Sequence, residues 1–117
     1  MQLSEVNDLA EAFKNFKLAL GTDSAMAYTC PEATTAIILL LQVSNIDGVN
    51  EADATVTWTD SSDSNASTAL VSTVPVPAGS ALGVLSGKLV LEAGDTIKGL
   101  ASAASDLVLS GSVVEMS

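Results

Sequence analysis

The sequence contains no arginine and no histidine, and nearly all of its charge is of one sign. Four lysines stand against 14 aspartates and glutamates, which gives a formal net charge of −10. Without histidine the chain lacks the commonest general base and metal ligand, and without arginine it lacks the side chain that holds a phosphate through two parallel hydrogen bonds. Four scattered lysines do not build the basic face that a nucleic-acid-binding protein needs. The composition therefore argues against an enzyme and against nucleic-acid binding.

Cysteine, aromatic residues and long apolar runs are also scarce. The single Cys30 has no partner for an internal disulfide and no histidine to activate it, so we expect a small buried hydrophobic residue there. The most apolar stretch, residues 36–41, is far shorter than the roughly 20 residues of a membrane helix. The N-terminus lacks the positive segment of a signal peptide. We therefore expect a protein that is made in the cytoplasm and does not bind a membrane.

The beginning of the chain has the period of a helix. Apolar residues recur there at intervals of three or four, namely Val6, Leu9, Phe13, Phe16 and Leu20. Ser4 is a suitable N-cap, and Gly21 is placed where a left-handed residue would end the helix. Acidic residues in the first turns and lysines near the end both suit the helix dipole. The pattern predicts an amphipathic helix over residues 4–20.

After Asp23 the period changes to that of strands. Residues 34–43 hold the most apolar run, and residues 54–59 alternate between apolar and threonine side chains. Turn-forming residues separate these segments from further strands predicted at 25–30, 68–74, 81–91, 96–101 and 106–116. Among the turns, 92–95 contains Gly94, which is free to adopt a positive φ. The side chains expected inside are Ile37, Leu39, Leu41, Val56, Trp58, Leu89, Leu91, Ile97, Leu107 and Leu109.

These patterns together predict a mainly β protein. We expect an antiparallel β-sandwich or a jelly-roll-like barrel of about seven to eight strands, preceded by the N-terminal amphipathic helix. Residues 1–24 would form a helix or arm for anchoring, and residues 25–117 would form the β-sandwich domain.

Two acidic loops are the clearest candidates for metal binding. Residues 47–53 and 60–65 each offer several oxygens, which calcium accepts, but neither has the spacing of an EF-hand. Aspartate and asparagine are common in turns because they bond their own backbone, and this reading is favoured. A Ser-Lys pair at Ser86 and Lys88 is the nearest approach to a nucleophile with a base, but a strand residue beside a glycine explains these residues without catalysis, and this reading is strongly favoured. We predict no catalytic residue, no cofactor and no required metal.

The apolar face of the predicted helix must be covered by something. The helix folds back on its own sandwich, or it docks on a neighbouring subunit. The second alternative is favoured, because a core between two sheets has no vacancy for two phenylalanines. The candidate partner-binding residues are Val6, Leu9, Phe13 and Phe16.

The C-terminal half contains a distinctive series of short motifs, at residues 74–80 (VPVPAGS), 87–97 (GKLVLEAGDTI), 101–104 (ASAA) and 110–115 (SGSVVE), with 28–31 and 43–48 as the start of the same module. In this order, the motifs resemble those of a group of small bacteriophage virion proteins. The resemblance covers roughly residues 25–117 and excludes the N-terminal segment. The resemblance implies a β-sandwich component of a virus particle in the head, neck or tail, and it carries no catalytic residues.

The leading hypothesis is therefore a bacteriophage head decoration (cement) protein that stabilises the capsid by bridging neighbouring subunits. The alternative is a neck or tail accessory subunit, or a tail-tip module that binds the host surface. The expected partners are other virion proteins, either the major capsid protein or neck and tail subunits, and further copies of the chain in a homo-oligomer. Its expected location is the virion, after synthesis in the host cytoplasm.

Overall fold

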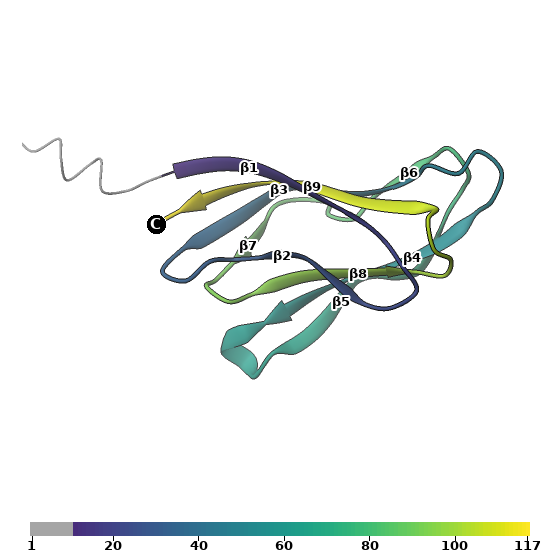
Figure 1. Ribbon diagram of the computed structural model, residues 1–117. Helices are drawn as coiled ribbons and strands as arrows, with labels where there is room; N and C mark the ends of the chain where they lie inside the picture. The colour runs from purple at the N-terminus through teal and green to yellow at the C-terminus, as the bar shows by residue number, and fades with distance from the viewer. Residues whose placement is uncertain (1–10) are drawn as a thin grey trace, which may run out of the picture.

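A computed structural model describes residues 11–117 as two antiparallel sheets that pack face to face (Figure 1). Sheet A has the strand order β1-β9-β3-β6, with β7 also paired to β3, and sheet B has the order β2-β8-β4-β5. The strands are β1 (Glu11–Ala19), β2 (Ala25–Thr29), β3 (Thr35–Asn45), β4 (Ala52–Asp60), β5 (Ala66–Val76), β6 (Ala81–Gly83), β7 (Leu89–Leu91), β8 (Thr96–Ala101) and β9 (Leu107–Met116).

The connections give this sandwich the topology of a jelly roll. The chain crosses repeatedly from one sheet to the other, and β6 and β7 both pair with β3 as two pieces of one interrupted strand. Counted in this way, eight strands form two four-stranded layers, as in double-sheet jelly rolls. The predicted β-sandwich is confirmed.

Most strands lie where alternation and turn residues placed them. β8 coincides with the predicted segment 96–101, and Gly94 in the preceding turn has a φ of 88°. The predicted segment 81–91 is instead divided into β6 and β7. Between them Val84 is buried, and its N–H donates to the carbonyl oxygen of Leu41 at 2.9 Å.

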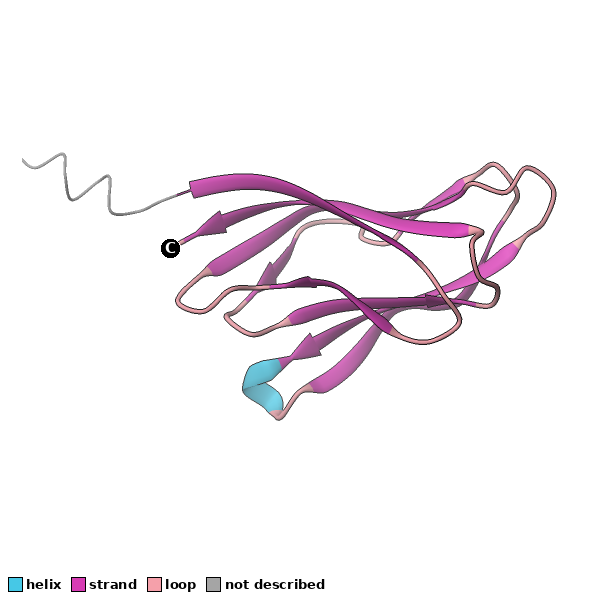
Figure 2. Cartoon of the chain, in the orientation of Figure 1, coloured by secondary structure: helices cyan, strands magenta, loops and turns pink. Residues whose placement is uncertain are grey.

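The predicted N-terminal helix is wrong wherever the structure describes it. Residues 11–19 form β1, which pairs with β9 along nine residues, and Leu20 then donates its N–H to the Leu107 carbonyl. Gly21 has no positive φ, so it is not the left-handed helix end that was expected. In the described residues, the only helix is the three-residue η1 (Ser61–Asp63) between β4 and β5 (Figure 2). Residues 4–10 of the predicted helix lie outside the described residues.

Residues 11–19 form a strand because β9, the strand beside them, is long and its backbone groups need hydrogen-bond partners. As a strand, β1 points every second side chain inward, and Phe16, Leu18 and Leu20 pack against the core. Without β1, the ten-residue β9 would expose a complete row of unpaired N–H and C=O groups at the edge of sheet A. These non-local contacts outweigh the local helix period.

The core prediction is right at most positions and wrong at two. Trp58 and Leu89 are partly buried and pack against the core. Leu39 is 38 % exposed and Ile37 is only half-buried, because a bulge between Ile38 and Leu40 changes which side chains of β3 point inward. The predicted residues that are fully buried are Leu41, Val56, Leu91, Ile97, Leu107 and Leu109.

Candidate functional site: the outer face of sheet A

The outer face of sheet A carries a row of apolar side chains that crosses four strands. Phe13 on β1 is paired with Val114 on β9, which is paired with Ile37 on β3, which is paired with Val90 on β7. Phe13 is 74 % exposed and Val90 is 54 % exposed, whereas Val114 between its neighbours is 8 % exposed. We call these four residues the apolar row.

The same face is almost free of charge. Among the outward-facing residues of β1, β9, β3, β6 and β7, only Glu11 and Lys17 are charged, and their charges cancel. The outer face of sheet B also carries one charge of each sign, Asp53 of β4 and Lys98 of β8, but it is more polar, because β4 presents Thr55 and Thr57 there. On a chain with a net charge of −10, a neutral and apolar sheet face is the surface best suited to bind a protein partner.

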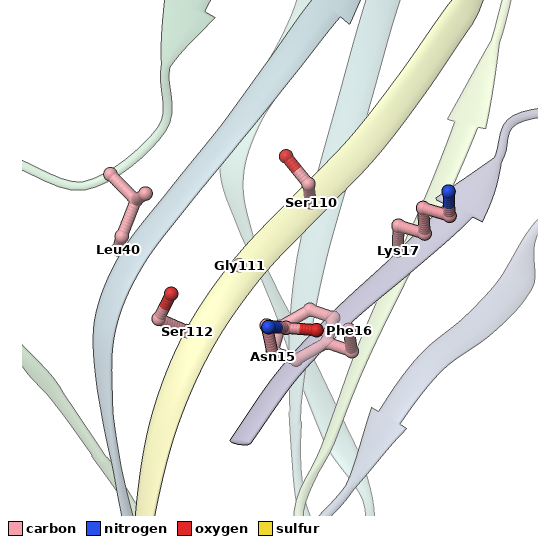
Figure 3. A pocket seen from close by; sticks show the side chains of 7 residues that line it. All are labelled: Asn15, Phe16, Lys17, Leu40, Ser110, Gly111 and Ser112. Carbon is pink, nitrogen blue, oxygen red and sulfur yellow. The ribbon is translucent and has the colours of Figure 1, made fainter. Parts of the chain in front are cut away.

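A hollow of about 350 Å³ lies next to the apolar row (Figure 3). Its floor is β9, where Ser110, Gly111 and Ser112 offer little side-chain volume. Leu40 of β3 stands on one side of β9 and Lys17 of β1 on the other, so the small residues form a depression between larger neighbours. Asn15 and Phe16 complete the lining. We call this depression the β9 hollow.

The structure separates the two phenylalanines that were predicted to share one stripe. They are three residues apart, which is one face of a helix but opposite faces of a strand. Phe13 points outward, whereas Phe16 points inward and its ring stacks on Tyr28 at a centroid distance of 5.2 Å. Val6 and Leu9 lie outside the described residues. The role of all four in binding a partner stays a prediction.

Three residues of the apolar row were not among the candidates from the sequence. Ile37 and Val90 belong to continuous apolar runs, which do not reveal the face on which each side chain lies. Val114 follows another valine and is ambiguous for the same reason. Only the register between strands brings them together with Phe13.

A polar cluster closes one end of the sandwich interior. Lys14 Nζ lies 2.8 Å from Glu115 Oε1, and the Tyr28 hydroxyl donates to Glu115 Oε2. The bonds from Lys14 and Tyr28 lower the pKa of Glu115, whereas burial and the bond to Glu115 raise the pKa of Tyr28. Because the carboxylate is ion-paired and the phenol holds its proton tightly, the cluster joins the two sheets and offers no free base.

The predicted acidic loop at residues 60–65 meets the turn at residues 92–95 in the structure. Asp60, Glu92 and Asp95 each place an oxygen within 4.8 Å of the others. Asp95 accepts hydrogen bonds from the Ser61 N–H and hydroxyl, both at 2.9 Å, and from the Glu92 N–H at 2.9 Å. Burial by itself raises the pKa of Asp95, but these donors outweigh it and lower the pKa. The bonds within the chain account for this buried carboxylate as a turn-stabilising residue.

The other acidic loop is also built as a turn. Asp47 Oδ1 accepts from the N–H groups of Val49 at 2.7 Å and Asn50 at 3.1 Å. These bonds lower the pKa of Asp47, while burial and the neighbouring Asp47 raise the pKa of Asp106. The geometry is that of an aspartate that orders its own loop.

Cys30 is buried, as expected from the sequence. Its thiol lies 3.3 Å from the Thr34 carbonyl oxygen and 3.7 Å from that of Leu91. Burial, together with Asp95 and Glu115, raises the pKa of the thiol. A protonated, buried thiol is a packing residue and a poor nucleophile.

Comparison with known proteins shows the fold and no family. Neither a protein-family model nor a curated protein sequence matches the chain. Within residues 11–117, no helix has the length and hydropathy required to span a membrane.

Three solved structures share the architecture. A chain of the disulfide-linked pili formed by Bacillus endospore appendages is 14% identical, with a TM-score of 0.53 over 92% of this chain and 86% of that one. A chain of the IBDV viral particle is 8% identical, with a TM-score of 0.53 over 91% of this chain and 31% of that one. A chain of an infectious bursal disease virus subviral particle is 10% identical, with a TM-score of 0.51 over 92% and 32%. This chain spans about a third of the length of the two viral chains.

Proposed function

We propose that this chain is a structural subunit of a virus particle and, more narrowly, a bacteriophage head decoration (cement) protein. The observation that carries the proposal is the outer face of sheet A. It is a neutral sheet face with an exposed phenylalanine and valine, on a chain that otherwise has a strong negative charge. Such a face binds protein rather than a charged substrate or nucleic acid.

Two further observations support the proposal. The sequence of residues 25–117 resembles small bacteriophage virion proteins, and chains of viral particles are built on a similar sandwich. In addition, the composition lacks the histidine and arginine side chains on which most catalytic sites depend. A role through surface contacts requires neither.

The mechanism is the burial of apolar area across repeated contacts. Burying a side chain such as Phe13 or Val90 contributes about 1.5–3 kcal/mol relative to leaving it in water. A subunit that bridges its neighbours repeats this contribution at every symmetry-related contact of the particle. The acidic loops at the ends of the sandwich keep the free subunit soluble before assembly.

The test is the copy number of the chain in purified particles. Virions purified from a host that produces this protein are analysed by quantitative mass spectrometry against a major structural protein. On the order of hundreds of copies per particle supports a decoration protein, whereas about a dozen supports the alternative of a neck or tail subunit. Absence from the purified particles overturns the virion assignment itself.

A variant of the apolar row links the copy number to the proposed surface. Phe13→Asp places a charge in the row and reduces incorporation into particles, because a buried unpaired charge is costly. Val49→Asp is the matched control, since Val49 is 84 % exposed in the loop between β3 and β4. Equal incorporation of both variants shows that the apolar row takes no part in the assembly of the particle.

A further inference from the structure

We propose that the outer face of sheet A binds a second copy of this chain. In this two-fold arrangement, Phe13 of each copy enters the β9 hollow of the other. The inference rests on the proposed function only in taking the chain to be an assembling subunit, and it names the partner that the apolar face receives.

The first argument is that one face carries both a projection and a matching depression. Phe13 projects from β1, and the β9 hollow lies on the same face beside it. A two-fold interface joins identical patches, so each patch must contain a group and the site that receives it. A large aromatic side chain that enters a pocket of small residues is a common energetic centre of such interfaces.

The second argument is the placement of the two charges on this face. Glu11 precedes Phe13 by two residues, and Lys17 lines the β9 hollow. When Phe13 enters the partner's hollow with the two β1 strands antiparallel, Glu11 of each copy approaches Lys17 of the other. The same pair that makes the face neutral therefore becomes two complementary contacts across the axis.

The third argument is the electrostatic repulsion between the acidic surfaces of two copies. The described acidic residues lie mostly in the connections between strands at the ends of the sandwich, for example Asp47, Glu51 and Asp63. Two copies of a chain with a net charge of −10 repel each other, and the repulsion is least when they meet through a surface without net charge. The outer face of sheet A meets this condition and also offers apolar area at Leu40 and Val90.

Sedimentation velocity of the full chain over a range of concentrations tests the proposal. We expect a reversible dimer, with a dissociation constant raised about tenfold or more by Phe13→Ser, which removes the projection. Ser112→Phe fills the hollow and is expected to weaken the dimer similarly. Val49→Ser removes another highly exposed apolar side chain and leaves the dimer unchanged. The fluorescence of Trp58 and the melting temperature at low protein concentration establish that each variant is folded.

Charge exchange identifies the partner as a second copy. Glu11→Lys and Lys17→Glu each place like charges across the two-fold axis and weaken the dimer. The double variant exchanges both signs, restores opposite charges at both contacts, and therefore recovers the affinity of the wild type. A double variant as weak as the single variants overturns the two-fold arrangement.

Two other results overturn the inference. One is a wild-type chain that stays monomeric up to concentrations on the order of millimolar. The other is a dimer whose affinity does not change in Phe13→Ser and Ser112→Phe. Neither result bears on the presence of the chain in virions, so the failure of this inference and the failure of the proposed function are distinguishable.

Discussion

Gly111 lies in β9 between Phe16 of β1 and Leu41 of β3, and replacing it with alanine tests the packing of sheet A. A Cβ added there would lie 2.5 Å from Phe16 Cζ and 2.7 Å from the Leu40 carbonyl oxygen. The ring is held by its stacking on Tyr28, and the carbonyl belongs to a paired strand, so neither moves without cost. Forcing a methyl group into a packed interior costs about 1–3 kcal/mol, and we expect Gly111→Ala to destabilise the fold by about 2 kcal/mol.

The matched control is Gly83→Ala at the edge of sheet A. A Cβ at Gly83 meets nothing within 4 Å, and its φ is not positive. Alanine in a strand is favoured over glycine by roughly 0.5–1 kcal/mol through backbone entropy, so this variant is neutral or slightly more stable. Urea unfolding, followed by the fluorescence of the single Trp58, gives the free energy for both variants.

A double-mutant cycle isolates the contact with the ring. Phe16→Ala is itself destabilising, but it removes the closest atom to the new Cβ, so adding Gly111→Ala costs less than it does in the wild type. Strictly additive losses, or a Gly111→Ala variant as stable as Gly83→Ala, would refute the inferred packing of Phe16 over β9.

The remaining predictions concern titration and the acidic turn. Burial and the bond to Glu115 raise the pKa of Tyr28 above its ordinary 10.0. The stabilisation that the protonated Tyr28 gives the folded state is therefore complete below pH 10.0 and is lost as the pH rises further. Tyr28→Phe flattens this alkaline decline in unfolding free energy, and an unchanged slope argues against the Tyr28–Glu115 bond. The pKa of Glu115 is lowered, so the stabilisation given by its carboxylate is present above its ordinary pKa of 4.5 and is lost as the pH falls. Glu115→Gln flattens this decline of the unfolding free energy in acid, which urea unfolding at each pH measures. Asp95→Asn removes an acceptor from the Ser61 and Glu92 donors and costs about 2 kcal/mol. Neither calcium nor a chelator changes the melting temperature of the wild type, and a calcium-dependent rise that Asp95→Asn abolishes would instead show a metal site.

The local patterns of the sequence predicted a strand correctly wherever the spacing of apolar residues and the flanking turn residues indicated the same segment. The segment 54–59 alternates and lies within β4, and the segment 96–101 follows a turn with Gly94 and forms β8 as predicted. The burial of Cys30 and the turn-forming role of Asp47 likewise follow from the nature of the side chain. At the candidate site, the sequence pointed to Phe13, whose side chain the structure exposes.

The sequence did not predict the apolar face of sheet A. Phe13, Val114, Ile37 and Val90 lie far apart in the chain, and only strand register aligns them. The bulge near Leu39 adds to the difficulty, because one extra residue reverses the faces of the side chains that follow it. The register depends on pairing between strands that are distant in the sequence, so the local spacing of apolar residues does not predict it.

The sequence alone determined that this protein is a mainly β sandwich, because its alternation, turn residues and lack of charge in the strands are local properties. The tertiary structure decided the conformation of residues 11–20. Their apolar side chains suit a helix by spacing, but β9 has a long edge whose backbone groups need partners. Pairing with β1 along nine residues gives the backbone groups of β9 their hydrogen-bond partners. The strand conformation also turns Phe13 outward, while Phe16 packs inside. Local preference is a matter of tenths of a kcal/mol per residue, and the hydrogen bonds and burial gained by completing a sheet exceed it.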